Sequence, residues 1–401
     1  MTNVKFSIYG DNVSPLENPE FLLEEFMRQS SFVQVERLTW DEAWPKLLGY
    51  ALFGGGPHIS QIGSIWTSTL MSMNVLRPFS ADEIQFLAGQ DAFYPSLWQD
   101  AMLTDQSSAW AIPFNAFTYL ILYRRDLLER ARVDEKTAFS TPQAMLETLK
   151  KLKAAGIQSP LVMPSGAPYR SRIHVLASWV WGAGGDFISA DGRKILFAEP
   201  EALNGLEQFF QLYRHMDPQD NNLTYQKCGV AFATGDAAVT ILGSSASSAL
   251  NPWGTQQVIE NLGVAVPPGI PWVGGANLVI WKETLLQMES EKAALALAQF
   301  LSTCSSQVKL AEASSVVPSR RDALEQLVYK YAPLKPAIQQ ALVSGRSYNA
   351  VPLWVRTMSE LRHVFDAITA DVISSPSRNV KEILALHLVP LADRFSLMLS
   401  K

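Results

Sequence analysis

Residues 33–66, VQVERLTWDEAWPKLLGYALFGGGPHISQIGSIW, form the pattern of a strand, a helix and a second strand in succession. Val33–Leu38 alternates apolar and polar side chains, as a half-buried strand does. After Asp41, which we expect to cap the helix, apolar side chains recur at helical spacing until three glycines end the pattern at 54–56. Ile59–Gly63 then predicts a short buried strand. A helix between two strands is the crossover unit of a parallel sheet, so the stretch predicts an α/β fold.

The same alternation continues on both sides of this stretch. Strands are predicted at 4–9, 111–123, 161–163, 230–232, 237–242, 264–267 and 277–281. Helices are predicted at 20–30, 126–132, 141–156, 173–181, 200–215, 290–302, 322–330, 334–344, 353–373 and 380–399. No low-complexity linker separates these elements, which indicates that the domains exchange chain segments and are not strung on a flexible tether.

The composition is that of a folded globular protein. The chain has 401 residues, of which 48% are apolar and 18% charged, enough for two to three domains of about 150 residues each. A net charge of −5 without a basic run lacks the electrostatic footprint of a nucleic-acid-binding protein. Cys228 and Cys304 are the two cysteines, too few for a disulfide framework or a zinc site, and we expect both to be free and buried.

No catalytic or cofactor-binding motif is present in the sequence. Phosphate-binding loops, nucleophile elbows and paired metal-binding histidines are absent, and the glycines at 182–185 lack dinucleotide-binding spacing. The acidic segment 217–222 lacks the glycine and final glutamate of a calcium loop. We therefore expect no metal, no cofactor and no enzymatic activity, and interpret the chain as a binding protein.

Several segments, taken in order, carry a resemblance. They are the quoted stretch, WAIPFNAFTYLILYRRDLL at 110–128, FATGDAAVTILG at 232–243 and VAVPPGIPWVGGAN at 264–277. Together they span nearly the whole chain and resemble the family 1 extracellular solute-binding proteins of bacterial ABC importers, the maltose-binding-protein-like group. The chain departs from the family pattern at His58, Phe117 and Arg124, where members carry aspartate, a sugar-binding carboxylate and asparagine. We therefore expect a ligand set that differs from that of maltose binders.

The resemblance implies a two-lobed, type II-like periplasmic-binding-protein fold. Each lobe would be a mixed, mostly parallel sheet flanked by helices, with a helical C-terminal region. The expected lobes are 1–112 with 266–317 and 113–265 with 318–401, joined by hinge crossings near 111–115, 264–268 and 316–320. Hinge closure around a ligand in the interlobe cleft would be a shift between open and closed populations.

Eleven tryptophans suit a sugar site, because aromatic faces pack on pyranose rings while polar side chains bind the hydroxyls. The resemblance places Ser64 and Trp66 in a cleft loop, and each nominated tryptophan also fits a core position, Trp40 in particular. The nominated ligand-binding residues are Asp11, Asn12, Trp40, Ser64, Trp66, Asn115, Phe117, Tyr169, Arg170, Ser244, Ser245, Trp253, Trp272, Asn277 and Trp354.

The resemblance implies the substrate-binding component of an ABC importer that captures an oligosaccharide or sugar-like solute. The alternatives are a non-sugar solute, such as a polyol phosphate or polyamine, and a glycoside-active enzyme, which would need two cleft carboxylates where only Asp11 is nominated. The implied partners are a small molecule and the importer's permease subunits, and we expect a monomer. The N-terminal residues lack signal-peptide features, which fits either a cytoplasmic protein or one whose leader has been removed. The resemblance implies the second, an extracytoplasmic protein, periplasmic or anchored as a lipoprotein, whose leader or lipid anchor is absent from this sequence.

Overall fold

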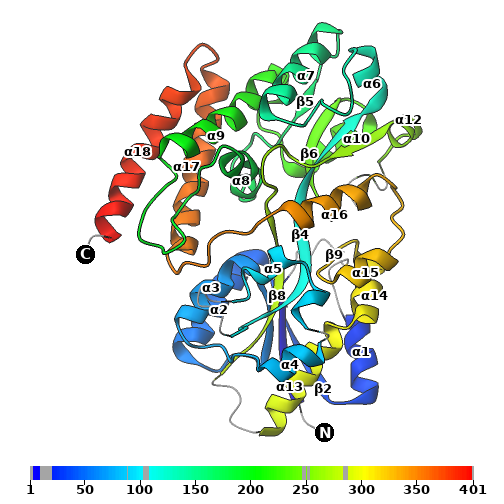
Figure 1. Ribbon diagram of the computed structural model, residues 1–401, viewed down its shortest axis with the longest axis vertical. Helices are drawn as coiled ribbons and strands as arrows, with labels where there is room; N and C mark the ends of the chain where they lie inside the picture. The colour runs from blue at the N-terminus through cyan, green and yellow to red at the C-terminus, as the bar shows by residue number, and fades with distance from the viewer. Residues whose placement is uncertain are drawn as a thin grey trace. The chain divides into compact units, whose positions relative to one another are not determined.

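The computed structural model describes residues 3–9, 20–87, 89–102, 108–245, 250, 253–282 and 288–399. The chain forms two compact units (Figure 1). Unit 1 comprises Met1–Phe117, Val273–Val328 and Arg346–Val355, and unit 2 comprises Thr118–Trp272, Tyr329–Gly345 and Arg356–Lys401. The expected lobe limits and hinge crossings stay a prediction, because the compactness of a unit does not reveal which residues move.

The sheet of unit 1 has the strand order β2-β1-β3-β8. β1 (Asn3–Tyr9) runs parallel to β2 (Phe32–Leu38) and to β3 (Ile59–Gly63), which confirms the three strands predicted there. β8 (Val273–Ile280) is antiparallel to β3 and joins the sheet after the chain has passed through unit 2. The sheet is therefore mixed.

Helices flank this sheet on both sides, with α2 and α3 on one side and α1 and α13 on the other (Figure 1). The helices of unit 1 are α1 (Glu20–Gln29), α2 (Trp40–Phe53), α3 (Ser64–Ser72), α4 (Ala81–Phe86), α5 (Pro95–Trp98), α13 (Met288–Leu301), α14 (Cys304–Ser314) and α15 (Arg321–Gln326). Their apolar faces and the strands enclose one core, with Phe6, Ile62 and Leu297 fully buried.

Two local predictions in unit 1 are wrong. The N-cap of α2 is Thr39, whose hydroxyl accepts from the Glu42 N–H while the Glu42 carboxylate accepts from the Thr39 N–H, so Asp41 lies inside the first turn. The loop expected after β3 is the helix α3, which begins directly at Ser64. Small polar residues of α3 are buried together with Trp66, Leu70 and Met71, so the sequence shows no clear amphipathic pattern there.

Unit 2 contains a second mixed sheet. β5 (Leu161–Val162) is parallel to β6 (Val239–Gly243), and β4 (Ile112–Arg124) is antiparallel to β6 and to β7 (Leu262–Ala265). β4 begins in unit 1, where Asn115 and Ala116 pair with β9 (Val317–Pro318), and continues into unit 2 from Thr118. One unbroken strand therefore carries the chain between the units.

The helices of unit 2 include the expected C-terminal ones. The helices of this unit are α6 (Arg125–Arg130), α7 (Pro142–Ala154), α8 (Arg172–Gly182), α9 (Pro200–Phe210), α10 (Tyr225–Thr234), α12 (Gln256–Glu260), α16 (Leu334–Ser344), α17 (Trp354–Ser374, beginning in unit 1) and α18 (Val380–Leu399). The strand predicted at 230–232 is wrong because those residues lie in α10, capped by Thr224 and by the left-handed Gly235. A Cβ on Gly205 of α9 would lie 2.4 Å from the Trp179 carbonyl oxygen, so this glycine permits the close packing of α8 and α9.

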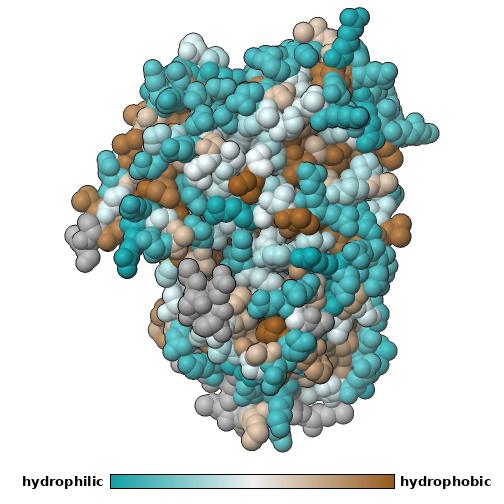
Figure 2. All heavy atoms as spheres, viewed as in Figure 1, coloured by the Kyte–Doolittle hydropathy of each residue, from teal (hydrophilic) through white to brown (hydrophobic). Residues whose placement is uncertain are grey.

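The visible face is largely hydrophilic, with apolar residues scattered over it (Figure 2). Within the described residues, no helix combines the length and the apolarity that a membrane span requires. Both cysteines are free as predicted, but only Cys228 is fully buried, and Cys304 is partly buried.

Candidate functional site

Four aromatic rings of unit 1 meet where the parallel strands end. Tyr9 is the last residue of β1, Trp40 and Trp44 lie on the first turns of α2, and Trp66 lies on the first turn of α3. The Trp40 ring lies 4.2 Å from that of Tyr9, and the Trp66 ring lies 5.7–5.9 Å from the other three. We call these four residues the tryptophan group.

The tryptophan group combines exposed and buried rings. Trp40 is 39% exposed and Trp44 is half-buried, whereas Tyr9 and Trp66 are 5% and 6% exposed. The carboxyl ends of strands in α/β sheets are where ligands usually bind, and an exposed indole offers a face for stacking. Two members of this group are nominated residues. Trp40 has an exposed face that a ligand could contact, whereas Trp66 is buried against it.

The polar residues nominated in unit 1 are held in the fold. The buried Asn277 side chain donates to Thr67 Oγ1 at 3.0 Å, and the Asn115 side-chain oxygen accepts from the Ala276 N–H at 2.8 Å. Ser64 is buried at the start of α3, beside the carboxylate of Asp100. These contacts fix α3 and β4 against β8.

Asp100 is a buried carboxyl group that no sequence pattern singled out. Burial raises the pKa of Asp100 from 3.8 to about 7, while hydrogen bonds to Ser347 and Ser64 act in the opposite direction. The Ser347 hydroxyl also donates to the Val273 carbonyl at 2.5 Å. The carboxyl therefore joins segment 346–355 to the start of α3 within unit 1.

The other residues nominated in unit 1 fall into three situations. Phe117 is half-buried near the middle of β4, and Trp354 is buried against Tyr348 with ring centroids 4.1 Å apart. Trp354 begins α17, as predicted. Asp11 and Asn12 lie outside the described residues.

Five ring-bearing residues gather in unit 2. Tyr119 is on β4, Tyr169 precedes α8, His174 is on α8, Tyr225 begins α10, and Trp272 ends the segment before β8. The His174 and Trp272 rings stack at 4.2 Å, Tyr119 lies 6.0 Å from Trp272, and Tyr169 stacks on Tyr225 at 6.4 Å. Burial first, and then the Tyr119 and Tyr225 side chains, raise the pKa of Tyr169. We call these five residues the tyrosine group.

Backbone pairing between β4 and β6 holds the tyrosine group together. The Ser244 N–H donates to the Thr118 carbonyl at 2.8 Å, and Ser244 Oγ accepts from the Thr118 N–H at 3.3 Å. Thr118 Oγ1 donates to the Trp272 carbonyl at 2.8 Å, and the Gly243 N–H donates to the Tyr225 hydroxyl at 2.8 Å. Ser244 therefore helps to place Tyr119 and Trp272.

The tyrosine group is uncharged near neutral pH. Burial raises the pKa of Tyr225 to about 12 and raises those of Tyr119 and Tyr169 further. Burial and the nearby Arg362 guanidinium lower the pKa of His174 well below 6.5, so its imidazole is neutral. Neutral hydroxyls and imidazole nitrogens can donate and accept hydrogen bonds, as the hydroxyls of a sugar or polyol require.

The Tyr169 hydroxyl is the polar atom of the tyrosine group that bears most directly on a ligand. Tyr169 is half-buried as a residue, but its hydroxyl is buried and makes no hydrogen bond to any residue that the structure describes. A buried polar group without a partner costs about 1–3 kcal/mol, so such atoms need a specific explanation.

The remaining nominated residues of unit 2 are not buried in this group. Trp253 is 56% exposed before α12, Arg170 is exposed, and Ser245 is half-buried after β6. The structure therefore brings Tyr169, Ser244 and Trp272 together and leaves Trp253 at the surface.

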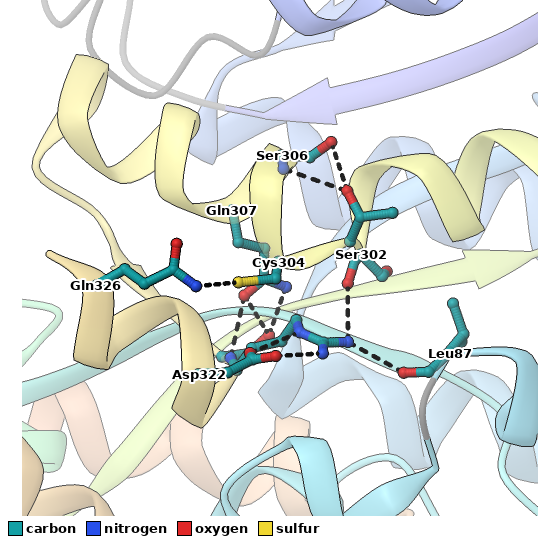
Figure 3. Close-up of polar contacts among 10 residues, drawn as sticks. Leu87, Ser302, Cys304, Ser306, Gln307, Asp322 and Gln326 are labelled. Carbon is teal, nitrogen blue, oxygen red and sulfur yellow. Dashed lines mark hydrogen bonds and ion pairs between the residues drawn. The ribbon is translucent and has the colours of Figure 1, made fainter.

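A third polar cluster, in unit 1, is structural (Figure 3). The Arg320 guanidinium forms hydrogen bonds of 2.9 and 2.7 Å with the Asp322 carboxylate and donates to the Leu87 carbonyl at 3.0 Å. Gln326 donates to Cys304 Sγ at 3.1 Å, and burial raises the pKa of that thiol. These contacts tie α14 to α15. In the described ranges, no three His, Cys, Asp or Glu side chains gather closely enough to hold a metal ion.

Sequence reasoning missed Tyr119, His174, Tyr225, Arg362 and Asp100. The signal for Tyr119 was available, since it lies two residues after the nominated Phe117 and therefore on the same face of β4. His174, Tyr225 and Arg362 carried no local signal, because each lies on a helix whose sequence is also compatible with a core or surface position.

The chain resembles known proteins in sequence over part of its length and in fold over its whole length. The chain is 27% identical over 121 residues to the sn-glycerol-3-phosphate-binding periplasmic protein UgpB of Shigella flexneri, a match that spans 27% of this chain and 26% of that protein. Its fold matches the sugar-binding protein MalE of Xanthomonas citri with a TM-score of 0.81 and 19% identity, covering 100% of both chains. Maltose-bound MalE3 of T. maritima matches with a TM-score of 0.75 and 20% identity, covering 97% of this chain and 100% of that one.

The two structural matches confirm the predicted two-lobed binding-protein fold, and at these identities they bear on the fold alone. The family described as bacterial extracellular solute-binding protein matches residues 23–337, more than three quarters of the sequence. The matched region contains all of the tyrosine group and three residues of the tryptophan group. The chain belongs to the bacterial extracellular solute-binding protein family.

Proposed function

We propose that this chain is the solute-binding component of an ABC importer and that its solute is a carbohydrate that contacts the tyrosine group. The observation that carries the proposal is the buried Tyr169 hydroxyl, which makes no hydrogen bond to a described residue although it lies beside stacked aromatic rings. A sugar hydroxyl would supply the missing partner, and the C–H face of the sugar would pack on the neighbouring rings.

The second candidate solute is a polyol phosphate. Arg362 lies close enough to Tyr119 and His174 to influence the pKa of both, and a guanidinium favours a phosphate. The partial similarity to a glycerol-3-phosphate-binding protein points the same way. A polyamine fits less well, because the carboxylate of Asp366 in this region already pairs with Arg172.

Membership of the family supports a role in binding and not in catalysis, and it supports a location outside the cytoplasm. Docking onto permease subunits, a monomeric state and hinge closure around the solute are parts of this proposal. Small-angle scattering with and without the solute tests closure, which would reduce the radius of gyration.

The test of the solute is a thermal-shift screen with maltose, longer maltooligosaccharides, monosaccharides and sn-glycerol 3-phosphate, followed by calorimetry. A solute present at about 100 times its Kd adds about 2.7 kcal/mol of stability, which raises the melting temperature visibly. Tyr169→Ala should abolish most of that shift. Stabilisation by no member of the panel would contradict the solute class, and consumption of a stabilising sugar would indicate an enzyme.

A further inference from the structure

We propose that the buried ion pair between Arg172 and Asp366 is a positioning pair that holds Tyr169 in place for the solute. This inference rests on the proposed function, in which Tyr169 contacts the solute. The pair joins the start of α8 to the middle of α17 within unit 2.

Arg172 supports the Tyr169 ring from the protein side. Its side chain is 1% exposed, and its guanidinium carbon lies 5.3 Å from the centre of the Tyr169 ring, within the range of a cation–π contact. The same guanidinium donates from Nε to the Tyr213 hydroxyl at 3.1 Å and from Nη2 to the Pro164 carbonyl at 3.4 Å. Arg172 therefore contacts both the ring and the start of the segment that carries it.

Asp366 fixes the backbone of the same residue. Its Oδ1 atom accepts from Arg172 Nη1 and also from the Tyr169 N–H at 3.4 Å. One carboxylate oxygen thus holds the peptide of Tyr169 and the cation below its ring. Loss of this carboxylate would release both contacts at once.

The segment before Tyr169 is already anchored at its other end. Ser165 Oγ donates to the Asp220 carbonyl at 2.9 Å and accepts from the Leu223 N–H at 2.9 Å. The N–H groups of Ser165 and Gly166 both donate to the Leu223 carbonyl at 3.1 Å. With this end fixed independently, the ion pair decides the placement of residues near Tyr169.

A buried ion pair is a weak source of net stability, because desolvation offsets its attraction. The contacts of Arg172 and Asp366 with Tyr169, and not the stability of the pair, therefore support a positioning role. Unit 2 provides a matched comparison in Arg124 and Asp126, where the arginine is 4% exposed and the hydrogen bonds are 2.8 and 2.5 Å long. That pair joins neighbouring residues at the start of α6. It contacts no member of the tyrosine group in any described hydrogen bond or ring contact.

The experiment labels the full chain with 3-fluorotyrosine and follows its eleven tyrosine signals by 19F NMR, with Tyr169 assigned from the Tyr169→Phe variant. Asp366→Asn should shift or broaden the Tyr169 signal, whereas the control Asp126→Asn should leave it unchanged. Arg172→Lys keeps the positive charge but loses the planar guanidinium with its several N–H donors, and should have a smaller effect of the same kind. An unchanged Tyr169 signal in both variants overturns the positioning pair. If Asp366→Asn does not fold, Arg172→Lys decides alone.

A binding measurement with maltose and sn-glycerol 3-phosphate tests the consequence for the solute. Asp366→Asn should raise Kd about tenfold in the native background and less than about twofold in a Tyr169→Ala background, because the pair acts through Tyr169. Equal effects in both backgrounds, or a native Kd in Asp366→Asn, overturn the inference. Binding of neither probe to the native protein instead overturns the proposed solute class, and the Tyr169 signal still decides the positioning pair.

Discussion

The tryptophan group and the tyrosine group both place rings in contact, but they differ in what they bury. In unit 1, Trp66 is covered by Tyr9, Trp40 and Trp44, and the contacts depend on ring area. In unit 2, the hydroxyl of Tyr169 is buried without a partner among the described residues. Ring burial stabilises a fold, whereas a buried unpaired hydroxyl costs stability.

This difference indicates that the two groups have different roles, one in stability and one in ligand binding. A group that contributes stability through every ring needs no ligand to explain it, and Trp40 is the most exposed of its rings. A group that carries an unsatisfied atom above a buried ion pair gives up stability, which native proteins do mainly at functional sites. Substitutions that move stability and affinity in different directions therefore test the comparison.

The largest effect is expected from Trp66→Ala. Because Trp66 is buried under three rings, we expect the free energy of unfolding to fall by about 3–5 kcal/mol. The matched variant Trp40→Ala removes a ring of the same kind that is 39% exposed, and should cost clearly less. Urea unfolding of both variants measures the difference. Equal losses would show that Trp40 is as much a core residue as Trp66.

The next effect depends on pH and concerns the buried polar group of unit 1, Asp100. Its pKa is raised to about 7 in the fold, so between about pH 4 and pH 7 the folded state keeps a proton that the unfolded state has lost. The contribution of Asp100 to stability therefore falls as the pH rises through this window and stays low above it.

Asp100→Asn should remove that dependence. We expect the variant to match the native protein at pH 4 and to exceed its stability at pH 8 by up to about 4 kcal/mol, which corresponds to three pKa units at 1.36 kcal/mol each. Urea unfolding at pH 4, 6 and 8 measures the difference. A variant that is less stable than the native protein at pH 8 would contradict the raised pKa, because it would show that the hydrogen bonds of the ionised carboxylate outweigh the cost of burying its charge.

The fold was largely predictable because local patterns determine its elements. β1, β2 and β3 followed from short periodic runs, and α16 and α18 from helical spacing, without any tertiary information. The misread elements were α3, which was expected as a loop, and α10, where the apolar triplet 230–232 fits a strand and a helix equally well.

The site was predictable only in part, because sheet pairing assembles it. Tyr119 meets Gly243 across β4 and β6, and this register brings Tyr225 and Trp272 beside it from more than a hundred residues away. The resemblance nominated Tyr169, Ser244 and Trp272, but neither spacing nor composition could indicate that His174 would stack on Trp272. The nominated binding roles themselves remain predictions.

The smallest expected effect is a change in stability whose sign is the most informative of the series. Tyr169→Phe removes the hydroxyl that is buried without a described partner and leaves the ring, so we expect stability to rise by up to about 1 kcal/mol while solute affinity falls. Tyr213→Phe is the matched control, because the Tyr213 hydroxyl accepts from Arg172 and donates to the Pro164 carbonyl, both at 3.1 Å. The control should lose stability.

Unfolding curves and calorimetry on the same preparations of both variants measure the two quantities. A hydroxyl kept for the solute gives opposite signs for stability and affinity, because the free protein carries its cost and the complex recovers it. A hydroxyl that serves the fold gives a loss in both. If Tyr169→Phe is less stable than the native protein and binds the solute with unchanged affinity, the tyrosine group belongs with the tryptophan group as packing, and the contrast between the two units disappears.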